Sequence, residues 1–322
     1  MEQRPLGHTG LTVSRLGLGT MTWGRDTDAD DAAAQLTAFV DAGGTLVDTA
    51  DVYVEGESER VLGRLLARGD VDRRDIVVAT KAASRRGEPR ARDASRRHLL
   101  DALDASLERL GLDHVDLWQM HAFDPATPIE ETLAALDTAV SSGRTRYVGV
   151  SNYSGWQTAK AATWQRAWPG RSPLVSTQVE YSLLQRAIEH EVMPAAIDLG
   201  LAILPWSPLG RGVLTGKYRG GTPADSRGAS PAFADFVQPY LDERSARIVG
   251  AVLTAADGLG VSPVAVALAW VRDRPGVTAP IVGARTVAQL KGSLDAEHVV
   301  LPDEIREALD DVSAPTSGHP TA

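Results

Sequence analysis

Short apolar runs alternate with longer amphipathic segments along most of the chain, and this alternation predicts an α/β fold. The short runs are rich in Val, Ile and Leu, as is typical of buried strands. We expect strands at residues 14–19, 46–48, 75–81, 115–121, 147–151, 175–180, 202–206 and 279–282. The longer segments repeat apolar residues at helical spacing, and many of them end at a glycine. We expect helices at residues 28–41, 57–66, 95–110, 129–142, 153–168, 189–199, 243–259, 262–272, 287–295 and 303–312.

Eight strands, most of them followed by a helix, predict a parallel sheet and fit a closed (β/α)8 TIM barrel. A doubly wound open sheet is the competing architecture. That fold commonly binds dinucleotides through a GxGxxG turn between a strand and a helix. The nearest match, GLG at residues 17–19, lacks both the third glycine and the helix. The barrel is therefore the favoured fold class.

Three segments fall outside this repeat. Residues 4–6 and 11–13 flank a glycine-containing turn and predict an N-terminal β-hairpin. Residues 207–241 are rich in Gly, Pro and Ser and show no clear element, and extra helices follow them at the C-terminus. We expect residues 1–314 to form a single domain and residues 315–322 to be a disordered tail.

Composition narrows the classes of function. Apolar residues make up 43% of the chain and charged residues 23%, which is typical of a globular protein with ample core. The net charge of −9 argues against nucleic acid or an anionic membrane as the main partner. The absence of cysteine excludes disulfides, thiolate chemistry and Cys-ligated metals. Neither a signal-peptide core nor a run of 18 apolar residues occurs, so we expect a cytoplasmic protein.

Titratable side chains end three successive predicted strands. Asp48, Lys81 and His121 end the second, third and fourth strands, and Tyr53 lies in the loop after the second. In a parallel barrel these ends share one mouth. A buried Lys81 needs a counter-ion such as Asp48, and an ammonium beside a phenol lowers the pKa of that phenol. Any one of these residues alone has an ordinary structural explanation; the combination predicts a proton donor for a carbonyl oxygen.

The chain resembles the aldo-keto reductase superfamily through motifs that occur in order over nearly its whole length. These motifs are GTMTWG (19–24), DTADVYVEGESE (48–59), ATK (79–81), DLWQMH (116–121), GVSN (149–152), STQVEYSLL (176–184), WSPLGRGVLTGKY (206–218) and IVGART (281–286). The nearest branch contains bacterial reductases and the β subunits of voltage-gated potassium channels. The resemblance implies NAD(P)H-dependent reduction of aldehydes and ketones without a metal. It also implies that Tyr53 is the general acid, that Lys81 and Asp48 lower its pKa, and that His121 orients the carbonyl.

The resemblance also implies a cofactor site. Ser151, Asn152 and Gln178 would hold the nicotinamide carboxamide, and Trp206 would stack on the ring. The other implied cofactor residues are Gly19, Thr20 and Met21 at the first strand end, Ser207, Leu209 and Gly210 with backbone N–H groups for the pyrophosphate, Lys217 and Arg227 over the phosphates, and Gly283, Arg285 and Gln289 at the adenosine end. Because Arg285 can pair with a 2′-phosphate, NADPH is favoured, with NADH as the alternative.

Two departures from the family pattern stand out. Gly292 and Ser293 replace the Glu-Asn pair that commonly contacts the adenine, and Val54 follows the tyrosine where the near branch usually has glycine. The substrate wall would include Met21 and residues of the 207–241 loop, together with Trp23, Val52, Val54 and Phe123. Trp23 and Phe123 suggest a hydrophobic carbonyl substrate, with packing at the rim as their alternative role. Two alternative functions stay open: a nucleotide-sensing regulatory protein like the channel β subunits, and an isomerase or lyase that forms an imine on Lys81.

Overall fold

Eight parallel strands form the centre of the computed structural model, which describes all residues except 86, 225, 231–232 and 316–322. The strands are β3 (Gly17–Gly19), β4 (Leu46–Asp48), β5 (Val77–Ala82), β6 (Val115–Met120), β7 (Thr145–Ser151), β8 (Leu174–Glu180), β9 (Ala202–Trp206) and β10 (Ile281–Gly283). They lie in the order β10-β3-β4-β5-β6-β7-β8-β9. A bridge between Ile203 and Val277 joins β9 to the segment before β10 and nearly closes the barrel. The predicted barrel is confirmed.

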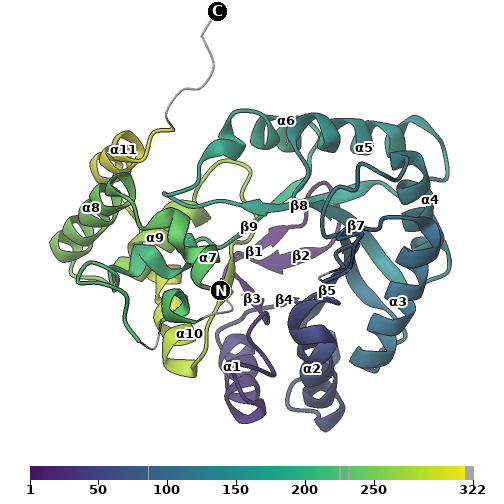
Figure 1. The fold of residues 1–322 in the computed structure, drawn as a ribbon, viewed down its shortest axis with the longest axis horizontal. Helices are drawn as coiled ribbons and strands as arrows, with labels where there is room; N and C mark the ends of the chain where they lie inside the picture. Colours follow the sequence, from purple (N-terminus) through teal and green to yellow (C-terminus); the bar gives the residue numbers. More distant parts are fainter. Residues whose placement is uncertain (86, 225, 231–232, 316–322) are drawn as a thin grey trace, which may run out of the picture.

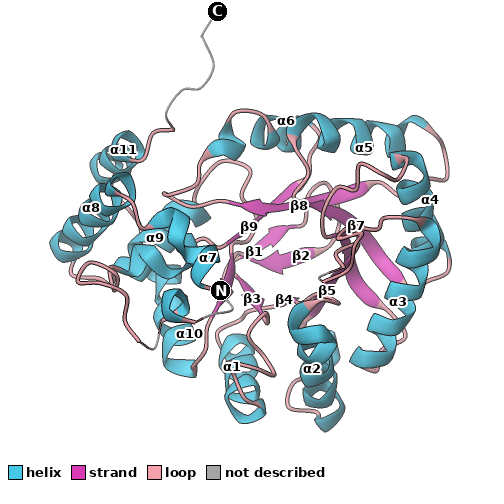
Figure 2. Ribbon diagram, viewed as in Figure 1, coloured by secondary structure: helices cyan, strands magenta, loops and turns pink. Residues whose placement is uncertain are grey.

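Helices surround the strands (Figures 1 and 2). The first six are α1 (Ala29–Asp41), α2 (Glu57–Arg68), α3 (Arg96–Leu110), α4 (Ile129–Ser141), α5 (Gly155–Ala167) and α6 (Val192–Asp198). Local sequence explains their ends. Asp28 accepts hydrogen bonds from the first turn of α1, and Ser154 with Gln157 forms a capping box at α5. Gly111 ends α3 in a left-handed conformation that favours glycine.

The N-terminal hairpin covers one end of the barrel. Its strands β1 (Gln3–Pro5) and β2 (Thr12–Ser14) pair in antiparallel fashion. Leu6 and Val13 from the hairpin are fully buried, and they share one apolar cluster with residues at the starts of the barrel strands, such as Leu46 and Ala202. The hairpin also takes Ser14 out of the predicted first strand, which therefore begins only at Gly17. The end of the barrel that carries the strand C-termini is left for the functional site.

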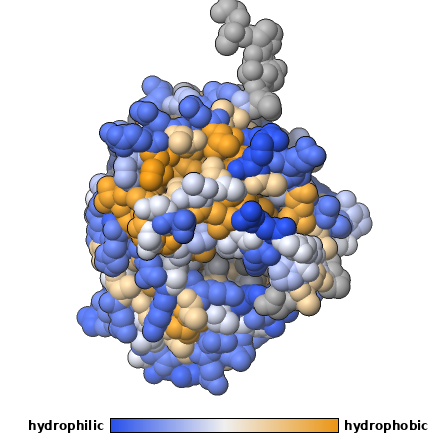
Figure 3. Space-filling model, turned by 90° about the vertical axis from the view of Figure 1, so that its left-hand side faces the viewer, coloured by the Kyte–Doolittle hydropathy of each residue, from blue (hydrophilic) through white to orange (hydrophobic). Residues whose placement is uncertain are grey.

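The remaining helices gather on one side of the barrel, at the left of Figure 1. They are α7 (Ala234–Val237), α8 (Glu243–Leu259), α9 (Pro263–Arg272), α10 (Val287–Leu294) and α11 (Asp303–Val312). Seven short 3-10 helices are described as well, η1 (Tyr53–Gly56), η2 (Arg73–Asp75), η3 (Ala187–Glu189), η4 (Gly210–Thr215), η5 (Arg227–Ala229), η6 (Gln238–Tyr240) and η7 (Asp295–His298). Figure 3 shows that this side of the molecule is hollowed, with hydrophilic residues bordering the hollow and apolar residues above it.

The described residues of segment 207–241, which has no periodic pattern, form the short helices η4, η5, α7 and η6 and no strand. Of the predicted tail, residues 316–322 lie outside the described part of the chain. No single helix among the described residues is long and apolar enough to cross a membrane; α8 and α9 meet that test only as a pair bent by 103°.

Candidate active site

Asp48, Lys81 and Tyr53 meet at the C-terminal end of β4 and β5. The Lys81 ammonium donates hydrogen bonds to Asp48 Oδ2 at 2.6 Å, to the Thr49 carbonyl at 2.8 Å and to the Tyr53 hydroxyl at 3.3 Å. Lys81 is 0% exposed and Asp48 is 2% exposed. The ammonium thus has three oxygen acceptors, as a buried cation requires. The structure brings these three residues together as the sequence predicts.

Lys81 keeps its charge in spite of complete burial. Burial alone would lower the pKa of Lys81, but attraction to Asp48 and to the Tyr53 oxygen outweighs this effect, and the pKa is raised. Asp48 is held from its other side, because Gln178 Nε2 donates to Asp48 Oδ1 at 2.8 Å. The site therefore places a fixed positive charge beside the phenol of Tyr53, which is the arrangement that favours loss of a proton from a phenol.

His121 and Trp206 are linked to this group through Asn152. The His121 ring lies 5.9 Å from the Tyr53 ring in an edge-to-face arrangement. The Asn152 side chain donates to the His121 carbonyl at 2.9 Å and accepts from Trp206 Nε1 at 2.9 Å. Asn152 adopts a left-handed backbone conformation (φ 57°), and its backbone N–H donates to the Gln178 carbonyl at 2.9 Å. Asn152 thus ties Trp206 to the strand ends that carry His121 and Gln178, and Gln178 in turn contacts Asp48.

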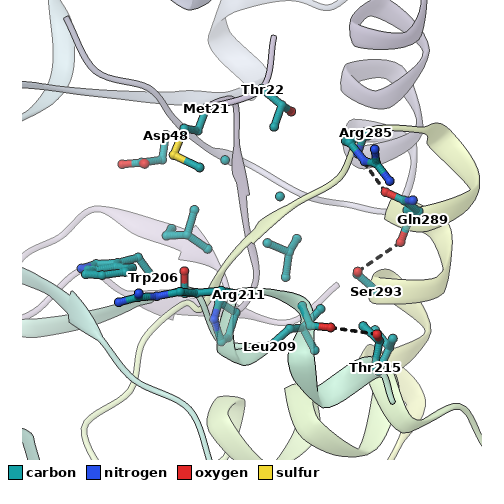
Figure 4. Close-up of a pocket in the computed structure, with 18 of the residues that line it drawn as sticks. Met21, Thr22, Asp48, Trp206, Leu209, Arg211, Thr215, Arg285, Gln289 and Ser293 are labelled. Atoms are coloured by element: carbon teal, nitrogen blue, oxygen red, sulfur yellow. Dashed lines mark hydrogen bonds between the residues drawn. The ribbon is translucent and has the colours of Figure 1, made fainter. Parts of the chain in front are cut away.

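A cavity of about 530 Å³ opens above these residues. Asp48, Met21 and Trp206 lie at one end of it, and Arg285 and Ser293 lie at the other (Figure 4). Most of the predicted site residues line this cavity: Gly19, Met21, Asp48, Tyr53, His121, Ser151, Asn152, Gln178, Trp206, Ser207, Leu209, Lys217, Gly283, Arg285 and Gln289. The elongated shape connects the strand ends to α10.

Several predicted residues lie elsewhere. The prediction that Trp23 lines the pocket is wrong, because Trp23 is 0% exposed and its indole N–H donates to Gln35 of α1. Thr20 is also fully buried and shares a hydrogen bond with Ser58. Gly210 is buried and donates its N–H to the Ser207 carbonyl, so it shapes the turn and does not border the cavity.

The remaining predicted wall residues also lie outside the lining of the cavity. Val52, Val54 and Phe123 do not border it, and Phe123 packs edge to face against Tyr153 and Trp156. The side chain of Arg227 falls outside the described residues.

Sequence reasoning missed Arg211 and Phe236, which both line the cavity. Arg211 pairs with both oxygens of Glu180 at 2.8 and 2.7 Å, donates to the Phe236 carbonyl, and stacks its guanidinium on the Phe236 ring with 3.7 Å to the centroid. The Phe236 ring in turn lies nearly parallel to Trp206, at a 17° interplanar angle. The pattern GRG within the 206–218 motif was the available signal for Arg211; Phe236 lies in a segment without periodicity.

Ser262 and Val264 at the start of α9, and Gly292 and Ser293 on α10, border the far end of the cavity. A β-carbon on Gly292 would meet no atom within 4 Å, so this end of the cavity is open. Within the described residues, no group of three or more His, Cys, Asp or Glu side chains is arranged to hold a metal ion.

Comparison with known proteins agrees with this geometry. Residues 15–314 match the sequence model of the Aldo/keto reductase family. An uncharacterized oxidoreductase of Bacillus subtilis, YrpG, is 39% identical, over 97% of this chain and 96% of that protein. A probable voltage-gated potassium channel subunit beta of Oryza sativa is 35% identical, over 99% and 98%. A versiconal hemiacetal acetate reductase of Aspergillus parasiticus is 30% identical, over 99% of each. The chain belongs to the aldo/keto reductase family of oxidoreductases.

Proposed function

We propose that this chain reduces aldehydes or ketones to alcohols with a nicotinamide nucleotide, NADPH in preference to NADH. The observation that carries the proposal is the buried Lys81–Asp48 pair, whose ammonium reaches the Tyr53 hydroxyl at one end of an elongated cavity. A proton donor of this kind is what reduction of a carbonyl group needs besides a hydride.

The cavity suits a dinucleotide in shape and charge. Trp206 offers an aromatic face beside Asp48 and Tyr53, where a nicotinamide ring would lie. Lys217 and Arg285 supply positive charge farther along the cavity, where phosphate groups would lie. Ser151, Asn152 and Gln178 would contact the carboxamide. Bound in this way, NADPH supplies the hydride.

The protein's own residues handle the proton. Tyr53 donates its phenolic proton to the carbonyl oxygen, and the Lys81 ammonium stabilises the phenolate that remains. Asp48 keeps Lys81 charged and in place, since breaking the pair would leave a buried charge without compensation. His121, whose ring meets that of Tyr53 edge to face, orients the carbonyl oxygen. Positioned proton donors of this type contribute about 10²- to 10⁴-fold to the rate.

A group of aromatic rings follows His121 in the chain, outside the lining of the cavity, and offers apolar surface near its mouth to a hydrophobic substrate. Phe123 lies two residues after His121, and its ring contacts those of Tyr153 and Trp156 at centroid distances of 5.3 and 5.9 Å. Trp156 is 59% exposed, so it presents an apolar face to the solvent. Large aromatic surfaces of this kind bind flat or apolar molecules. We infer that aromatic and long-chain carbonyl compounds are better substrates than short aliphatic ones.

The alternative proposal is a nucleotide-sensing regulatory protein with little turnover, because relatives named as potassium channel β subunits share 35% identity. The imine-forming alternative loses support, since Lys81 is fully buried and already donates to three oxygens.

A panel of aldehydes and ketones, assayed for consumption of NADPH and of NADH in parallel, separates the reductase from the regulatory protein. We expect carbonyl-dependent oxidation of NADPH at turnover rates of about 1 s⁻¹ or more. Binding of NADPH without consumption across the whole panel would favour the regulatory alternative.

A further inference from the structure

A second group of charged side chains lies near Lys81, outside the lining of the cavity, and has no role in the reaction described above. It consists of Asp51, in the loop between Asp48 and Tyr53, Glu59 of α2 and Arg109 of α3. The Asp51 N–H donates to the Lys81 carbonyl at 3.1 Å, which ties Asp51 to the strand that carries Lys81. Asp51 therefore lies beside Lys81, and none of the three residues lines the cavity.

Glu59 and Arg109 form the fixed part of this group. Glu59 is 0% exposed, and its carboxylate accepts hydrogen bonds from Arg109 Nε at 2.6 Å and from Thr80 Oγ1 at 2.5 Å. Thr80 directly precedes Lys81 on β5. The buried carboxylate thus has both an opposite charge and a hydroxyl donor, as a stable buried ion requires.

Arg109 also supports the turn that carries Tyr53. A β-carbon on Gly56 would come within 2.7 Å of Arg109 Cδ, so the turn and the arginine side chain are in close contact. Within this turn Val54 and Glu55 adopt left-handed conformations, with φ angles of 49° and 55°. A β-branched residue is strained there and persists only where its surroundings hold it. Contact with Arg109 is one such restraint.

Asp51 is the titratable part of the group. Its Oδ1 is buried and has no hydrogen-bond partner among the described residues. Burial, together with the nearby Glu59 carboxylate, raises the pKa of Asp51 to about 7, although Arg109, the Val52 N–H and the Lys81 ammonium act in the opposite direction. The Asp51 carboxyl therefore changes its charge near neutral pH, close to the site of proton transfer.

We propose that Asp51, in the loop between Asp48 and Tyr53 and tied to the Lys81 strand, is a positioning residue whose carboxyl sets the charge near the Tyr53 phenol. The proposal rests on the proposed reductase function. Ionised Asp51 adds a negative charge near Tyr53 and Lys81, and a negative charge opposes formation of the phenolate. Protonated Asp51 removes this opposition, so the proton donor becomes stronger as pH falls below neutrality.

The test is an ultraviolet titration of the phenol in the cofactor-free protein. The Tyr53→Phe spectrum is subtracted from that of the wild type, and Asp51→Asn is compared with the same variant that also carries Tyr53→Phe. We expect Asp51→Asn to lower the midpoint of the Tyr53 transition by about half a pH unit to one unit, as removal of one nearby charge does. Asp75→Asn, which changes an exposed residue at the end of η2, is the control and leaves the midpoint unchanged. Equal midpoints in the wild type and Asp51→Asn would overturn the proposal.

Activity gives a second readout. The pH profile of kcat/KM for the wild type should bend near neutrality, and this bend should be absent in Asp51→Asn. If the wild-type protein reduces no carbonyl compound, the proposed reductase function is wrong. The phenol titration would then still decide the role of Asp51. If near-ultraviolet circular dichroism shows that Asp51→Asn is unfolded, Asp51→Ser, which is smaller and equally neutral, takes its place in both measurements.

Discussion

The two ends of the cavity differ in how their charges are held. At the catalytic end, Lys81 and Asp48 are almost inaccessible to solvent and are joined to Gln178 and Thr49 by short hydrogen bonds. At the far end, beside α10, Gln289 is exposed, and the guanidinium of Arg285 forms no ion pair within the described part of the chain. The charges around Tyr53 are thus preorganised by the protein, whereas the charge of Arg285 is open to a ligand.

Breaking the charge pair at the catalytic end should have the largest effect. Lys81→Met leaves Asp48 buried without a counter-ion, so we expect a loss of about 3–5 kcal/mol in the free energy of unfolding. Urea denaturation measures this loss. Lys217→Ala removes an exposed lysine from the same cavity and should change stability by less than about 0.5 kcal/mol. Equal losses of unfolding free energy in Lys81→Met and Lys217→Ala would show that charges at the two ends of the cavity contribute equally to stability.

The group of Asp51, Glu59 and Arg109 should give the next largest effect, through the pH dependence of stability. The folded state raises the pKa of Asp51 from 3.8 to about 7. The folded protein therefore binds the Asp51 proton more tightly than the unfolded chain does. Below about pH 4 the protonated carboxyl contributes at most about 4 kcal/mol to the free energy of unfolding, relative to the ionised form. This contribution is lost as the pH rises to about 7. Asp51→Asn lacks this dependence. We expect the unfolding free energy of Asp51→Asn to rise relative to the wild type between about pH 4 and 7, and a constant difference would contradict the account.

At the adenosine end, Arg285→Ala should affect ligand binding and leave the protein's stability intact. A hydrogen bond to a charged group contributes about 1.5–3 kcal/mol, so we expect the Kd for NADPH to rise at least about tenfold while the Kd for NADH changes little. Isothermal titration calorimetry measures both constants. Lys291→Ala, which changes an exposed residue of α10 that does not border the cavity, is the matched control. A parallel rise for both nucleotides would mean that Arg285 does not contact the 2′-phosphate.

The smallest effect should come from the turn after Tyr53. Val54 has a φ of 49°, and glycine adopts this conformation without strain. Val54→Gly should therefore raise the free energy of unfolding by about 1 kcal/mol. Val52 has a φ of −88°, so Val52→Gly should lower stability instead. Thermal melts of the two variants decide the matter, and a loss in both would remove the evidence for strain at Val54.

Much of this architecture follows from pattern. The apolar runs at β4 and β9 and the helix at α8 have the bounds that periodicity predicts. The residues at strand ends could be placed at one mouth because parallel strands share their direction. The roles of Trp23 and Phe236 could not be predicted, because they depend on tertiary partners. Trp23 is buried by its contact with Gln35 of α1, and Phe236 is positioned by Arg211 within a segment that lacks a repeat.

Val54 departs from the family pattern at a position where the backbone itself favours glycine. Glycine is usual there in the near branch, and the structure shows the left-handed backbone that favours glycine. The departure at Gly292 and Ser293 leaves the far end of the cavity open. Neither departure disturbs the Asp48–Lys81–Tyr53 arrangement.

The central claim is that Tyr53 is the proton donor for carbonyl reduction, and Tyr53→Phe tests it most directly. The variant keeps the ring against His121 but removes the hydroxyl that Lys81 contacts. Carbonyl-dependent NADPH oxidation is measured beside NADPH binding, which quenching of tryptophan fluorescence reports because Trp206 lines the cavity. We predict that turnover falls by about 10²-fold or more while the Kd for NADPH is unchanged. Reduction of carbonyls by Tyr53→Phe at the wild-type rate would contradict the account.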